Sequence, residues 1–156
     1  MGRTVVRSTH VVRSGSSSSG DRTWIIAVIF ACIALLFVIL AVALPGWNGR
    51  HLLKICTSTC LSTTVLSFIA MFLIFLGIIA TILFALRLIT SFSSTIKTSA
   101  VILLALGGIF IVAAYVSYYR HDPNHYSYYL MVTAGIFTFV SSILTAFWLG
   151  RNWHSV

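Results

Sequence analysis

Four stretches of the chain contain no charged side chain over more than 20 residues each. They cover residues 23–49, 55–86, 98–119 and 126–150, about two-thirds of the 156 residues. The hydrocarbon core of a bilayer is about 30 Å thick, and about 20 apolar residues cross it as a helix. The sequence therefore predicts an all-α membrane protein, a bundle of four transmembrane helices.

Aromatic residues near the ends of these stretches, among them Trp24 and Trp148, indicate where the helices meet the headgroups. We expect spans at about residues 24–44, 61–86, 99–119 and 127–149, within a transmembrane domain of residues 24–150. The first span exceeds the 7 to 15 apolar residues of a signal peptide, so we interpret it as a retained helix. Residues 1–23 are a basic, Ser/Gly-rich tail expected to be disordered, and residues 151–156 form a short C-terminal segment.

Lys and Arg residues between the spans predict the orientation, because positive residues are retained on the cytoplasmic side. Seven lie on the cytoplasmic side and three on the other if both termini are cytoplasmic. Four of the seven belong to the tail, and we expect them to contact anionic lipid of the inner leaflet: Arg3, Arg7, Arg13 and Arg22. The chain shows no basic patch with interleaved aromatics, so nucleic acid is not an expected partner.

Groups suited to catalysis are scarce. The acidic residues are Asp21, in the tail, and Asp122, in a turn, which excludes a pair of catalytic carboxylates. No ionisable group suited to proton or ion transfer lies inside a span. His121 and His125 are separated by Pro123, which breaks the helical spacing that a metal pair requires. We expect no enzyme activity, no cofactor and no metal.

Small residues predict how the helices pack, since close approach drives helix association in lipid. The fourth span carries a small residue at every fourth position, and the third span carries a pair of glycines. These residues form the predicted packing face: Gly107, Gly108, Ala134, Thr138, Ser142 and Ala146. We interpret this face as internal to the bundle, with contact between copies of the chain as the alternative.

Cys56 and Cys60 lie at the junction of the first loop and the second span, on the outer side in the proposed orientation. Disulfides persist there, and the two cysteines can bridge if the segment is not helical. If they begin the second helix, their separation is near the upper limit for a disulfide. In the opposite orientation they would be candidates for palmitoylation.

Three segments resemble the superfamily of claudins, peripheral myelin protein and epithelial membrane proteins. They are LPGWNGRHLLKIC after the first span, ALGGIFIVAAYVSYY in the third and YSYYLMVTAGIFTFVSSIL in the fourth. Trp47 would match the first Trp of the family's first extracellular loop, and Cys56 and Cys60 its cysteine pair. The family's Gly-Leu-Trp is missing and the loop has about 15 residues, so the resemblance does not extend to the β-sheet that seals junctions.

The resemblance implies a protein of the plasma membrane that acts through lateral contacts, at cell contacts or as an accessory subunit of a channel or receptor. The ending His154, Ser155, Val156 is no ER-retrieval signal and suits this location. Phe68, Phe72 and Phe75 share a helix face that suits an integral membrane partner, and a stripe that faces lipid would look the same.

Two alternatives remain open. A self-assembled pore would use the hydroxyl stripe of Thr138, Ser141, Ser142 and Thr145. A vesicle-trafficking tetraspan of the MARVEL type would use the polar second loop, residues 90–99.

Overall fold

The computed structural model describes residues 22–45, 61–86, 94–119 and 126–151. These residues form four helices and, within the described ranges, no strand. The helices are α1 (Thr23–Ala43), α3 (Leu61–Ala85), α4 (Ser94–Tyr119) and α5 (Tyr126–Arg151). Each is long and apolar enough to cross a membrane. The predicted all-α four-helix fold is therefore confirmed, and the chain is an integral, multi-pass membrane protein.

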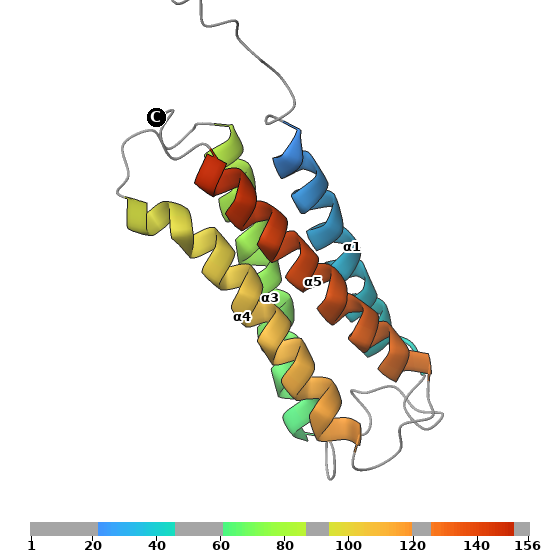
Figure 1. Cartoon of the computed structure of the whole chain (residues 1–156). Helices are drawn as coiled ribbons and strands as arrows, with labels where there is room; N and C mark the ends of the chain where they lie inside the picture. Colours follow the sequence, from blue (N-terminus) through green and yellow to red (C-terminus); the bar gives the residue numbers. More distant parts are fainter. Residues whose placement is uncertain (1–21, 46–60, 87–93, 120–125, 152–156) are drawn as a thin grey trace, which may run out of the picture.

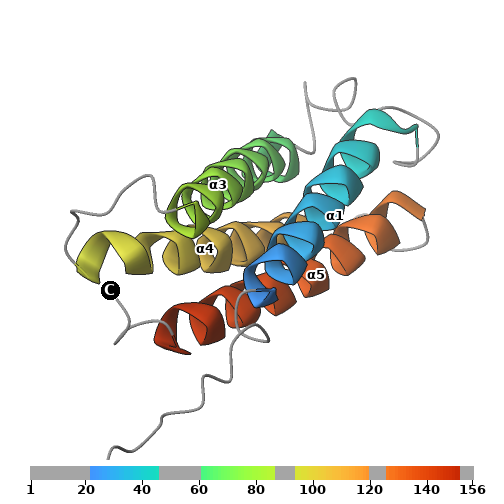
Figure 2. The ribbon, with the colours of Figure 1, turned by 90° about the horizontal axis from the view of Figure 1, so that it is seen from above.

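The four helices lie side by side, each antiparallel to the helix before it in the chain (Figure 1). They form a ring in which α1 contacts α3, α3 contacts α4, α4 contacts α5, and α5 returns to α1 (Figure 2). The α3–α4 and α1–α5 contacts are the most extensive, and the α1–α3 contact is the least. The bundle thus consists of two tightly packed helix pairs joined through α4 and α5.

The helix limits follow from local chemistry. Leu44 ends α1 in an extended conformation, with φ −78° and ψ 147°. It precedes Pro45, and the residue before a proline is sterically disfavoured in the helical conformation. Helix α4 begins at Ser94, five residues before the expected start at 99, although its apolar span begins only at Thr98. Hydropathy identifies only the part of a helix that is suited to the hydrocarbon core. Helix α4 begins before that part, with a polar first turn.

Buried positions recur along every helix at alternating spacings of four and three residues. They are Ala27, Ala31, Ala34, Val38 and Ala41 in α1; Thr63, Ser67, Ala70, Ile74, Gly77 and Thr81 in α3; Ala100, Leu104, Gly107, Ile111, Ala114 and Tyr118 in α4; and Ser127, Met131, Ala134, Thr138, Ser141, Thr145 and Trp148 in α5. A mean spacing of 3.5 residues is typical of left-handed, coiled-coil-like packing. The four inner faces therefore meet along most of the length of the helices.

Most of these inner residues are Ala, Gly, Ser or Thr, while the outward positions carry Ile, Leu and Phe. Lipid is as apolar as the bundle interior, so burial does not separate polar from apolar side chains as it does in water. Small side chains lie inside because they let the backbones approach closely. In this bundle, the buried faces of the helices are therefore lined mainly by small residues.

Candidate functional site

Helices α3 and α4 approach each other closely at a reciprocal pair of glycines. A Cβ placed on Gly107 would lie 2.7 Å from Cγ1 of Ile74, and one placed on Gly77 would lie 2.8 Å from Cγ of Leu104. Each glycine thus receives a large side chain from the opposite helix. The predicted packing residue Gly107 lies at the centre of this contact, together with Gly77.

The second predicted glycine, Gly108, faces α5. A Cβ there would lie 3.1 Å from the ring of Phe139, and a Cβ on Gly135 would lie 3.4 Å from Cγ2 of Ile111. The adjacent glycines of α4 therefore serve two interfaces, with Gly107 against α3 and Gly108 against α5. One glycine of α4 could not serve both interfaces, because one position on a helix faces only one neighbouring helix.

Ser141 connects α5 to α1. Its Oγ donates a hydrogen bond of 2.8 Å to the backbone carbonyl of Ala27, and both residues are fully buried. Nearby, the ring of Phe137 packs against two rings of α1, with centroids 5.4 Å from Phe30 and 5.8 Å from Phe37. The sequence-based packing face included neither Ser141 nor Phe137. Their role in the contact between α1 and α5 is seen only when the two helices are placed side by side.

Three residues of the predicted packing stripe of α5 lie inside the bundle, and the fourth does not. Ala134 and Thr138 are fully buried and Ser142 is 7% exposed, whereas Ala146 is exposed on the outside of the bundle. A helix turns about 100° per residue, so a strict four-residue repeat rotates by about 40° at each step. Over three steps the stripe leaves the inner face, and Thr145 takes the inner position instead.

The hydroxyl stripe proposed for a pore lies inside the single bundle. Thr138 and Thr145 donate to the carbonyls of Ala134 and Ser141, four residues earlier in the same helix. Ser142 donates to the carbonyl of Val101 in α4 at 3.4 Å, and Ser141 bonds to α1 as described above. All four hydroxyls are buried and bonded to backbone, which leaves none of them to line a water-filled channel between copies of the chain.

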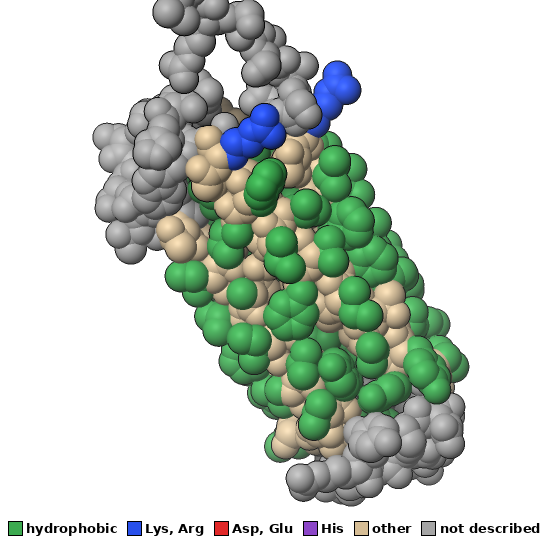
Figure 3. All heavy atoms as spheres, viewed as in Figure 1, with side chains coloured by type: hydrophobic (Ala, Val, Ile, Leu, Met, Phe, Trp, Pro, Cys, Tyr) green, Lys and Arg blue, Asp and Glu red, His purple; other side chains and the backbone are tan. Residues whose placement is uncertain are grey.

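On the face of the bundle that Figure 3 shows, the described side chains between the two ends are hydrophobic or uncharged. Helix α3 carries three outward phenylalanines, Phe68, Phe72 and Phe75, which are 42%, 62% and 50% exposed. The outward face of α1 is aliphatic, with Ile29 and Leu36 about half exposed. Among the described faces, α3 thus offers the densest group of exposed aromatic rings.

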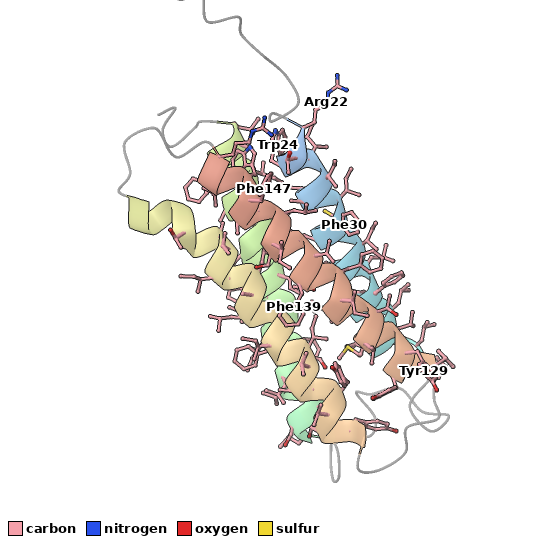
Figure 4. The ribbon with its side chains drawn as sticks, in the orientation of Figure 1. Arg22, Trp24, Phe30, Tyr129, Phe139 and Phe147 are labelled. Atoms are coloured by element: carbon pink, nitrogen blue, oxygen red, sulfur yellow. The ribbon has the colours of Figure 1, made fainter. Side chains whose placement is uncertain are left out.

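Charged side chains of the described residues lie at one end of the bundle (Figure 3). Arg22 precedes α1 and Arg151 ends α5, and both are exposed. Figure 4 shows Arg22 and Trp24 together at this end. Trp148, expected in the belt of interfacial aromatics, lies three residues before the end of α5 and is buried against the other helices.

Several predicted residues lie outside the described ranges: Arg3, Arg7, Arg13, Cys56, Cys60, His121 and His125. Among the residues that the structure does describe, Cys32 is exposed, and no group of three His, Cys, Asp or Glu could hold a metal ion. The arrangement is suited to packing against lipid and other helices.

No protein-family model matches the chain, and no curated protein or solved structure matches it either. The geometry of the bundle and the residues quoted above are therefore the basis for assigning a function.

Proposed function

We propose that this protein is a claudin-like tetraspan of the plasma membrane that acts by lateral helix contacts. It accompanies a channel or receptor as an accessory subunit, or organises membrane proteins at cell contacts. Both termini lie on the cytoplasmic side in this proposal. The observation that carries it is the outward aromatic face of α3, formed by Phe68, Phe72 and Phe75.

The inner face of the bundle supports this assignment because it is already occupied. The buried hydroxyls of Ser67, Thr81, Thr138 and Thr145 bond to carbonyls of their own helices. The small side chains between the helices let the backbones meet closely. A contact with another protein would therefore use the outer surface of the bundle.

The phenylalanines of α3 suit a partner helix better than the other described faces do. They recur at intervals of four and three residues, which places the rings in a row along one side of the helix. Aromatic pairs contribute about 0.5–1.5 kcal/mol beyond the area they bury. Aromatic rings on a second helix could form such pairs with these phenylalanines, whereas lipid chains could not. The aliphatic face of α1 has no such preference for a helix over lipid.

The test is to extract the native particle in mild detergent, measure its mass and identify each chain in it by mass spectrometry. We expect a stoichiometric integral membrane partner beside the 17.1 kDa chain. A particle that contains copies of this chain alone would overturn the accessory assignment and favour a self-assembled pore, which conductance in a reconstituted bilayer would then test.

A matched pair of variants locates the contact. Phe68→Leu, Phe72→Leu and Phe75→Leu together keep the face of α3 apolar and remove its rings. Ile136→Leu, Ile143→Leu and Phe147→Leu also place leucine at three outward positions, here on α5, but remove only one ring; all three residues are at least 60% exposed. We expect the α3 variant to lose the partner and the α5 variant to keep it. Equal retention by both would contradict a contact through α3.

A further inference from the structure

Arg22 and Arg151 are 129 positions apart in the sequence and lie at the same end of the bundle. The α1–α5 contact brings them to this end, because Ser141 of α5 bonds to Ala27 of α1 and the two helices run antiparallel. Both arginines are exposed. We propose that Arg22 and Arg151 form a binding site for an anionic phospholipid headgroup on the folded bundle, distinct from the lipid contacts expected of Arg3, Arg7 and Arg13.

The distribution of charge over the whole chain supports an anionic ligand at this end. In the sequence, Arg87 comes two positions after the last residue of α3, and Lys97 belongs to the first turn of α4. Asp21 comes directly before Arg22 in the sequence. Next to these helix ends the sequence thus has more basic than acidic residues, even without the three arginines farther out in the tail.

The start of α1 provides a second attraction for a phosphate. Arg22 is the N-cap of α1 and makes no side-chain capping hydrogen bond. The first turn of α1 contains no acidic residue that would balance the positive end of the helix dipole. Uncapped backbone N–H groups at a helix start favour negative charge and are a recurrent phosphate site.

The apolar surroundings identify a lipid as the source of the phosphate. Exposed Ile25 and Ile26 lie within four residues of Arg22, and Phe147 lies four residues before Arg151. Trp24, partly exposed, lies beside Arg22, and such rings prefer the level of the headgroups (Figure 4). A bound molecule would therefore meet positive charge at its headgroup and apolar side chains along its acyl chains.

The test uses the full chain in detergent, with phosphatidylserine or phosphatidylcholine added, and native mass spectrometry to measure the retained lipid. A basic residue near a membrane surface strengthens binding of anionic lipid about fivefold, so we expect Arg22→Gln with Arg151→Gln to weaken phosphatidylserine retention about thirtyfold. Retention of phosphatidylcholine should stay the same. Unchanged retention of phosphatidylserine, or an equal loss of both lipids, would overturn the proposal.

Control variants separate this site from the rest of the chain. Arg22→Gln with Arg151→Gln should weaken retention by the same factor in a chain that also carries Arg3→Gln, Arg7→Gln and Arg13→Gln, because the tail contributes separately. Arg120→Gln, at the sequence position directly after α4, should leave retention within about threefold. Loss of the effect in the tail variant, or a loss with Arg120→Gln as large as in the double Arg→Gln variant, would place the binding elsewhere.

Two further measurements guard against a misfolded variant and a soluble ligand. Arg22→Lys with Arg151→Lys keeps both charges and should keep retention within about threefold, whereas a loss as large as with Gln would overturn a site based on charge. Glycerophosphoserine, which lacks acyl chains, should not displace the lipid at equal concentration. Displacement would identify a site for a soluble phosphate compound and contradict the lipid.

Discussion

Gly107 of α4 lies against Ile74 of α3 with no room for a methyl group, since a Cβ on Gly107 would be 2.7 Å from Cγ1 of Ile74. The backbone nitrogen of Ile74 and the carbonyl oxygen of Ala70 would be 3.4 and 3.5 Å away. Ile74 is fully buried, and a β-branched side chain in a helix has essentially one rotamer. The side chain of Ile74 therefore cannot swing aside, and an added Cβ would separate the two helices.

Gly107→Ala should accordingly lower the free energy of unfolding by about 1–3 kcal/mol, the usual cost of overpacking, despite the better helix propensity of alanine. Unfolding in mixed micelles with increasing SDS, followed by circular dichroism, measures the change. Gly150→Ala is the control, because no atom lies within 4 Å of a Cβ there, and it should be neutral or slightly stabilising.

A second-site change tests the cause of that loss. Ile74→Ala removes Cγ1, the atom nearest to the added Cβ. The double variant Gly107→Ala, Ile74→Ala should then be less destabilised than the sum of the two single variants, by about 0.5 kcal/mol or more. Strict additivity would show that the contact with Ile74 does not limit the approach of α3 and α4.

Ser141→Ala should destabilise the bundle by about 0.6 kcal/mol, the average for a hydrogen bond between transmembrane helices. The variant removes the 2.8 Å bond to the carbonyl of Ala27. Thr138→Val is the comparison, because the Thr138 hydroxyl bonds to its own helix and links no second helix. We expect Thr138→Val to change stability by only a few tenths of a kcal/mol in the same SDS titration. An equal loss of stability in both variants would show that the Ser141 hydrogen bond does not stabilise the contact between α1 and α5.

Phe137→Leu should cost about 1–2 kcal/mol, because the ring of Phe137 contacts both Phe30 and Phe37 of α1. Leucine keeps the position apolar, so the loss reports mainly on the aromatic contacts. Phe147→Leu, at a residue 62% exposed on the same helix, should change stability little. Thermal unfolding of the purified protein in detergent distinguishes the two variants.

Labelling of single cysteines tests the proposed orientation. In a background with Cys32→Ala, Cys56→Ser and Cys60→Ser, the exposed positions Ser62 and Gly150 mark opposite ends of the bundle. A membrane-impermeant maleimide should label Ser62→Cys on intact cells, and should label Gly150→Cys only after permeabilisation. The reverse result would place both termini outside the cytoplasm and would make Arg22 and Arg151 outer-leaflet residues.

The number and type of the helices could be predicted from the sequence. Residues 55–86 are free of charge, and α3 occupies Leu61–Ala85 within them. A charge-free apolar stretch of this length has few stable alternatives in lipid, since its backbone hydrogen bonds must be satisfied internally and a helix does so within one segment. This local argument needs no knowledge of the other helices.

Parts of the candidate site were also visible in the sequence. Gly107, Ala134 and Thr138 are small residues within long apolar spans, and all three are buried. The phenylalanines of α3 share a face at helical spacing, and all three are exposed. The hydrogen bond from Ser141 of α5 to Ala27 of α1 was not visible, because the sequence does not show which helices become neighbours.

The sequence by itself thus determined that four helices cross the membrane and approximately where each begins and ends. Only the tertiary structure decided which side of each helix faces inward, as Ala146 and Thr145 show: these neighbours are both small, yet one is exposed and the other fully buried. In water, polarity would separate the two sides of a helix before the fold is known. In lipid both sides are apolar, so the inner side is set by how closely specific partner helices can approach.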